Sequence, residues 1–128
     1  MKTMKHLITG LFLVLFSFSL TAQDKMMKEV VKTVALEQTK GEFTQKSITL
    51  TEGTYMFEIA NNGVDHEVGF VLAPKGKTDA AHHIKEAYVT KAVATNSKTN
   101  SQKVTLKKGE YIYFCPLNPT PQYTLIVK

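Results

Sequence analysis

Apolar and polar side chains alternate with a period of two along most of the chain after residue 30. In TYMFEIA (residues 54–60), the side chains of Tyr55, Phe57 and Ile59 share one parity and have polar or smaller neighbours. Residues two apart in a strand point to the same face, so this pattern favours half-buried strands. Further segments alternate in the same way: 48–50, 66–72, 104–106, 111–115 and 123–127. Gly and Asn turn signals separate these segments, and together they predict an all-β domain, either an antiparallel β-sandwich or a barrel.

One segment departs from this alternation. In TDAAHHIKEAY (residues 78–88), Ala80, Ile84, Ala87 and Tyr88 recur at helical spacing. The sequence therefore predicts one short helix or an ordered loop near 78–88.

The first residues have the pattern of a secretory signal peptide. Lys2 and Lys5 precede the apolar run Leu11–Phe16, and Thr21-Ala22 supplies a small residue before a polar stretch. The apolar run is shorter than the ~20 residues that a membrane helix needs, so we expect no membrane span after cleavage. We expect three parts: a signal peptide over 1–22, a flexible leader over 23–29 and one domain over 30–128. The protein is then exported, to the periplasm or to the medium.

The positive charge of the chain is carried by lysine alone. The sequence has 16 Lys and Arg residues against 11 Asp and Glu, a formal net charge of +5, and none of the 16 is Arg. Proteins that read nucleic acid or clamp phosphate rely on the planar guanidinium of Arg. We therefore expect no nucleic-acid partner and regard the lysines as a solvated surface.

Cys115 is the single cysteine, so it cannot form a disulfide within the chain. It is expected to be buried, bound to a metal or paired with another molecule. His66 shares its parity with Val68 and Phe70, which predicts an inward-facing imidazole, and Cys115 shares its parity with Tyr113. If the two side chains approach one another, thiolate and imidazole form a soft ligand pair suited to copper or zinc.

Two long stretches of the chain follow a pattern of strand, glycine turn and aromatic strand. GEFTQKSITLTEGTYMFEIANNGVDHEVGF (residues 41–70) ends with a His before an apolar run, and KVTLKKGEYIYFCPLNPTPQYTLIVK (residues 103–128) has an aromatic strand that ends in Cys-Pro. In these features the chain resembles the cupredoxin family. The resemblance implies an all-β, antiparallel Greek-key β-sandwich. It also implies copper as the cofactor, electron transfer as the role and a redox partner protein.

The resemblance also implies a ligand set, which this chain contains only in part. His66 and Cys115 stand at the positions of the family's first His and Cys ligands. The family takes a second His and an axial Met from the loop after the Cys, and that loop, PLNPTPQY (residues 116–123), contains neither.

Four other residues are candidates to complete the site. Asn118 stands where many members place the second His, and Gln122 lies near the position of the axial ligand. A side-chain amide is a harder donor than imidazole and a poorer ligand for a soft metal. His82 and His83 are the other histidines after the predicted signal peptide, and neighbouring positions on a helix diverge by ~100°, so at most one of them could join a given site.

Two functions follow from these observations. The first is an exported cupredoxin-like protein that binds copper through His66 and Cys115, for electron transfer or copper handling. The alternative is a metal-free β-sandwich binding module that has lost the copper site and keeps both residues in its interior. A third hypothesis, a Cys115 nucleophile activated by His66, lacks an orienting Asn or Asp, and Pro116 leaves no helix start beside the thiol. We therefore do not expect an enzyme.

Overall fold

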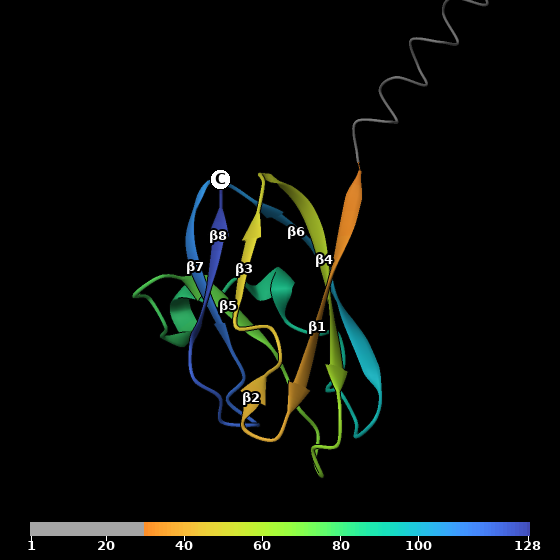
Figure 1. The fold of residues 1–128 in the computed structure, drawn as a ribbon. Helices are drawn as coiled ribbons and strands as arrows, with labels where there is room; N and C mark the ends of the chain where they lie inside the picture. The colour runs from red at the N-terminus through yellow and green to blue at the C-terminus, as the bar shows by residue number, and fades with distance from the viewer. Residues whose placement is uncertain (1–29) are drawn as a thin grey trace, which may run out of the picture. The chain divides into compact units, whose positions relative to one another are not determined.

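A computed structural model describes residues 30–128 as two facing β-sheets (Figure 1). The first sheet has the order β2-β1-β4-β6 and is built from β1 (Val31–Thr39), β2 (Glu42–Phe43), β4 (Gly53–Asn61) and β6 (Lys98–Leu106). The second has the order β3-β8-β7-β5 and is built from β3 (Ser47–Leu50), β5 (Val71–Pro74), β7 (Gly109–Phe114) and β8 (Tyr123–Val127). The predicted signal peptide and leader lie outside the described residues.

Two of the strand pairs are parallel, β1 with β4 and β3 with β8, whereas the other pairs are antiparallel. The chain leaves the first sheet after β2, forms β3 in the second sheet and returns as β4, so β4 runs beside β1 in the same direction (Figure 1). The predicted β-sandwich is confirmed. Its sheets are mixed rather than purely antiparallel.

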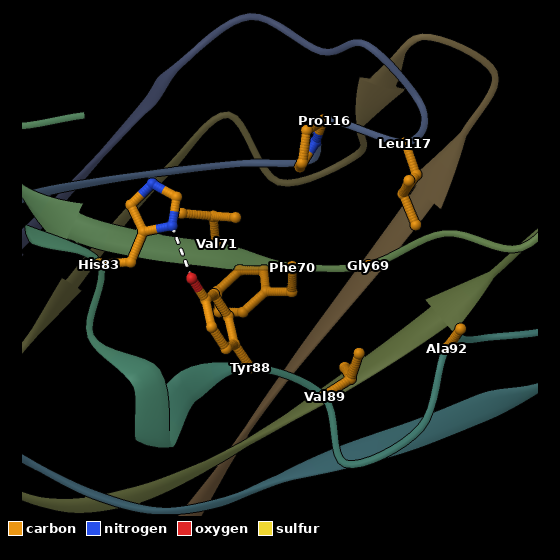
Figure 2. Close-up of a pocket in the computed structure, with 9 residues that line it drawn as sticks. All are labelled: Gly69, Phe70, Val71, His83, Tyr88, Val89, Ala92, Pro116 and Leu117. Carbon is orange, nitrogen blue, oxygen red and sulfur yellow. Dashed lines mark hydrogen bonds between the residues drawn. The ribbon is translucent and has the colours of Figure 1, made fainter. Parts of the chain in front are cut away.

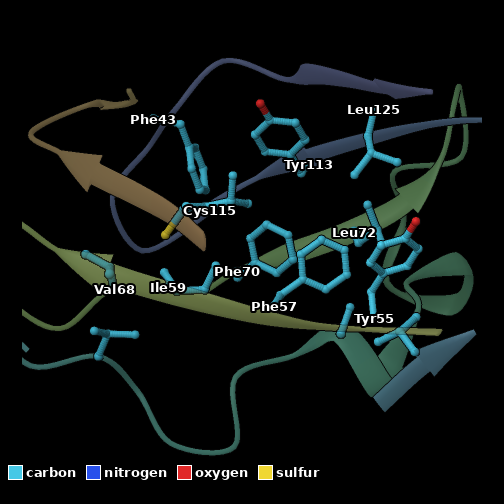
Figure 3. Packing of buried hydrophobic residues seen from close by; sticks show 14 of the residues in the cluster. Phe43, Tyr55, Phe57, Ile59, Val68, Phe70, Leu72, Tyr113, Cys115 and Leu125 are labelled. Atoms are coloured by element: carbon cyan, nitrogen blue, oxygen red, sulfur yellow. The ribbon is translucent and has the colours of Figure 1, made fainter. Parts of the chain in front are cut away.

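The core lies between the sheets and is rich in aromatic rings (Figure 3). The alternation in β4 predicted its inner face correctly, because Tyr55, Phe57 and Ile59 are all buried. Phe43 in β2 is fully buried, and its ring makes edge contacts with Tyr113 at 5.1 Å between ring centroids. It also makes edge contacts with the rings of Phe70 and Tyr123. The short strand β2 therefore connects the first sheet to the aromatic core.

The segment between β5 and β6 is an ordered loop with two single 3₁₀ turns, η1 (Ala80–His82) and η2 (Lys85–Ala87). The helical spacing does not continue into an α-helix, because the residues after both turns have extended backbones. The loop is tied to both sheets: Ile84 N–H donates to the carbonyl of Leu72 at 2.8 Å, and Val89 bridges to Ser101 in β6. The loop alternative for 78–88 is the one that the structure adopts. Within residues 30–128, no helix is long and apolar enough to cross a membrane.

The buried phenol of Tyr113 in β7 makes the free energy of unfolding depend on pH under alkaline conditions. Its ring is fully buried and its hydroxyl donates to the backbone carbonyl of Gln45 at 2.6 Å. Burial raises the pKa of Tyr113 to about 12, with a smaller contribution from the charge of Tyr123. The folded state therefore resists ionisation of this phenol more than the unfolded state does.

Tyr113→Phe tests this coupling. At pH 8 the substitution should lower the free energy of unfolding by about 1 kcal/mol, because the hydrogen bond to Gln45 is lost. Since the folded pKa lies above the unfolded value near 10, the stability that the wild-type residue contributes is complete below pH 10 and is lost as the pH rises through 12. Urea denaturation of both proteins between pH 10 and pH 12 should show the wild type losing about 2 kcal/mol relative to the variant. A difference that stays constant across this range would contradict the coupling.

Candidate functional site at the Cys115 loop

The Cys115 loop (residues 115–122) joins β7 to β8 at the end of the sandwich that also carries β2 (Figure 1). Two hydrogen bonds close it: Cys115 N–H donates to Thr120 Oγ1 at 3.0 Å, and Thr120 N–H donates to the carbonyl of Cys115 at 3.3 Å. Proline at 116, 119 and 121 restricts the backbone further. The loop therefore has a defined shape without any ligand.

The thiol of Cys115 is part of the core. The residue is fully buried, and Figure 3 shows it among Phe43, Ile59 and Val68. Its sulfur accepts two backbone hydrogen bonds, from Gly69 N–H and from Asn118 N–H, each at 3.3 Å. The neighbours of the sulfur are thus backbone amides and apolar side chains.

Asn118 is buried, and both the oxygen and the nitrogen of its side-chain amide make hydrogen bonds to the protein. Its Oδ1 accepts from Gly41 N–H at 2.7 Å, and its Nδ2 donates to the carbonyl of Thr39 at 2.9 Å and to Gln38 Oε1 at 3.1 Å. Both amide protons are therefore engaged. Gly41 sits at the turn after β1 with φ +78°, a conformation that glycine adopts without strain.

Gln38 completes a network around the thiol. It is fully buried at the end of β1, and its Nε2 donates to the carbonyl of Gly69 at 2.7 Å. We refer to the side chains of Gln38 and Asn118 with their backbone partners at 39, 41 and 69 as the Gln38–Asn118 network. It joins β1, the turn after β1, the segment before β5 and the Cys115 loop. Gln38 was not among the residues predicted for the site, although its shared parity with Leu36 marks it as a polar residue on the inner face of β1.

His66 does not lie on the inner face. Its side chain is exposed, and its Nδ1 lies 2.9 Å from the carbonyl oxygen of Glu67. The inward orientation predicted from parity was wrong because regular pairing in β5 begins only at Val71, and Val68 makes an isolated bridge to Val93. From this segment it is Gly69, through its N–H, that reaches the sulfur.

The remaining candidates are held by other partners or exposed. Gln122 is exposed. His82 is exposed and pairs through Nδ1 with the carboxylate of Asp79 at 2.8 Å, and this hydrogen bond lowers the pKa of Asp79. His83 is half-buried, with Nδ1 2.7 Å from the Tyr88 hydroxyl and Nε2 2.8 Å from the carbonyl of Thr78.

The donor groups around the sulfur do not fit a copper centre, which needs imidazole or a second soft ligand beside the thiolate. The hydrogen bonds to the sulfur come from two backbone N–H groups, and the side-chain amide of Asn118 is engaged by Gly41, Gln38 and Thr39. In the part of the chain that the structure describes, no group of three or more His, Cys, Asp or Glu side chains has the arrangement of a metal site. The assignment of His66 and Cys115 as metal ligands stays a prediction, as do the supporting roles of Asn118, Gln122, His82 and His83.

An apolar recess lies beside the Cys115 loop (Figure 2). It has a volume of about 380 Å³ and is bounded by residues 69–71, by parts of 83–92 and by Pro116 and Leu117. Leu117 is 55% exposed and Tyr88 36%, which makes them two of the few large hydrophobic residues that the described domain exposes.

Comparisons with known proteins agree with this architecture. A family model described as a cupredoxin-like domain matches residues 8–127. The chain therefore belongs to the cupredoxin-like domain family. No curated protein matches the sequence significantly.

Solved structures of auracyanins share the fold. Auracyanin A, a "blue" copper protein from Chloroflexus aurantiacus, superposes with a TM-score of 0.62 at 17% identity, over 77% of this chain and all of that one. Auracyanin B superposes with a TM-score of 0.62 at 19% identity, over 76% of this chain and 88% of that one. Reduced auracyanin from Roseiflexus castenholzii superposes with a TM-score of 0.59 at 14% identity, over 76% of this chain and 97% of that one. At these identities the likeness shows the fold.

Asn118→Ala tests the Gln38–Asn118 network. The substitution removes the acceptor of Gly41 N–H and the partner of the buried Gln38 amide, so the free energy of unfolding should fall by about 3 kcal/mol. Urea denaturation measures this loss. The matched control is Asn62→Ala, which removes an exposed amide with one hydrogen bond to Glu37 and should cost about 0.5 kcal/mol or less. Equal losses in the two variants would contradict a structural role for the network.

Burial of Cys115 predicts an inert thiol. Iodoacetamide at neutral pH should alkylate the native protein at least about 100-fold more slowly than the urea-unfolded protein, because reaction requires local opening of the core. Mass spectrometry after timed quenching gives both rates. Rapid alkylation of the native protein would instead revive the hypothesis of a Cys115 nucleophile.

Proposed function

We propose that this chain uses the cupredoxin fold as a metal-free binding module in which Cys115 is a structural residue. The observation that carries the proposal is the surroundings of the sulfur, which is buried and accepts two backbone N–H groups. Free cysteine behaves as a small hydrophobe in protein cores. The amide of Asn118 holds the loop through hydrogen bonds to the protein.

The surface beside the Cys115 loop supports a binding role. The apolar recess and the exposed Leu117 and Tyr88 lie together at one end of the sandwich. Apolar surface that is concave and exposed marks ligand or partner sites more often than ordinary surface. The module acts outside the cytoplasm, in the periplasm or in the medium, on the basis of the predicted signal peptide at 1–22.

Copper binding through His66 and Cys115 is the second candidate. Family membership favours it, together with the position of Cys115 directly after β7. In this case the protein carries electrons to a redox partner protein or handles copper. In that case the exposed imidazole of His66 and the buried sulfur of Cys115 coordinate the same ion.

A copper titration separates the two candidates. Protein from expression of the full chain is titrated with Cu(II), and anaerobically with Cu(I), and the visible absorption and the copper retained after gel filtration are measured. We expect no intense thiolate-to-copper charge-transfer band and the same retained copper for the wild type, Cys115→Ala and His66→Ala. An intense band, or one copper per chain that is lost in Cys115→Ala, would overturn the metal-free module and support the copper hypothesis.

A further inference from the structure

The hydroxyl of Tyr88 lies at the apolar recess, and its neighbours determine whether it can donate or accept a further hydrogen bond. His83 Nε2 lies 2.8 Å from the carbonyl oxygen of Thr78, and a carbonyl only accepts, so Nε2 carries the proton of the neutral imidazole. His83 Nδ1 is then an acceptor, and the Tyr88 hydroxyl, 2.7 Å away, donates to it (Figure 2). The Tyr88 oxygen therefore keeps only acceptor capacity for a molecule in the recess.

The lining of the recess sets the remaining requirements. Phe70, Val89, Ala92 and Leu117 contribute apolar surface, and among residues 30–128 no Lys, Asp or Glu side chain lines the recess. A volume of about 380 Å³ lies at the lower end of the range for small-molecule pockets, which is about 300–1,000 Å³. A charged ligand would lose its hydration without gaining a partner of opposite charge, so the lining selects neutral molecules.

Leu117 and the 83–92 segment hold this shape from opposite sides. The position of a Cβ at Gly69 would lie 3.7 Å from Leu117 Cδ1, so the loop leucine packs closely over the segment before β5. His83 makes an edge contact with Phe114 at 6.0 Å between ring centroids and an edge contact with Tyr88 at 5.9 Å. The Tyr88 hydroxyl is therefore held at the His83 end of the recess.

We propose that the recess binds a small, neutral, mainly apolar molecule that donates one hydrogen bond to the hydroxyl oxygen of Tyr88. Hydrogen-bond complementarity and the absence of charged lining residues select this class, and an extended peptide would need several backbone partners that one phenol does not supply. The inference deepens the proposed function by naming the ligand class of the binding module. It depends on the recess and not on whether copper binds.

Two probes with the same ring system test the proposal: one carries a hydroxyl donor, and in the other a methyl ether replaces it. The isotope-labelled full chain is titrated with 2-naphthol and, separately, with 2-methoxynaphthalene, and amide chemical shifts are followed by NMR. Both probes should shift amides of residues 69–71, 83–92 and 117. 2-Naphthol should bind roughly three- to tenfold more tightly, the ratio that one net hydrogen bond supplies.

Three variants locate the interaction. Tyr88→Phe keeps the ring and removes the acceptor, so the two probes should bind it equally. Leu117→Lys places a charge at an exposed position of the recess and should weaken both probes about tenfold. The matched control is Thr49→Lys, exposed on β3 at the opposite edge of the same sheet from β5, and it should bind both probes as the wild type does.

Several outcomes would overturn the ligand class: no shifts at the recess, equal affinity of the wild type for both probes, a preference that survives Tyr88→Phe, or unchanged binding to Leu117→Lys. The copper titration is a separate readout. If the probes do not bind the recess as expected and copper is not bound through Cys115, the proposal of a metal-free module stands and only its ligand class is wrong. If copper binds through Cys115 while the probes behave as expected, the recess is a site on a copper protein.

Discussion

The structure around the Cys115 loop depends on one constraint, the burial of the amide side chains of Gln38 and Asn118. A buried amide without hydrogen-bond partners costs more than the bond itself contributes, so the surrounding backbone must supply those partners. The carbonyls of Thr39 and Gly69 and the N–H of Gly41 do so. Among residues 30–128, every buried side-chain nitrogen and oxygen has a partner. The network therefore joins β1 and the turn after it to the segment before β5 and to the Cys115 loop.

The chain has the fold of its family, and buried amides hold together the region around Cys115. The chain belongs to the cupredoxin-like domain family and has the sandwich found in auracyanins. At the end of β7, however, the amide of Asn118 binds the turn after β1, and backbone amides bind the sulfur of Cys115. The partners of both groups are therefore supplied by the chain itself. Beside the Cys115 loop lies the apolar recess that Leu117, Tyr88 and their neighbours line.

Much of the fold was predictable from local pattern, and the failures have a common cause. The alternation in β4 identified its buried face, because strand geometry alone sends successive side chains to opposite faces. For residues 78–88 the helical spacing left a helix or a loop open, and contacts with β5 and β6 decided in favour of two 3₁₀ turns. For His66, parity predicted an inward-facing side chain, and this was wrong because the chain is not a regular strand there. Periodicity has predictive value only where backbone pairing is continuous.

The sequence by itself determined the β class, the inner face of β4 and the presence of a single thiol at a strand end. Each of these depends on residues that are neighbours along the chain and on the geometry of one backbone segment. Only the tertiary structure decided that β1 runs parallel to β4, that Gly69 reaches the sulfur and that Asn118 pairs with Gln38. Gln38 and Asn118 are 80 positions apart, and their meeting is decided by how the sheets pack, a property that no local stretch of sequence contains.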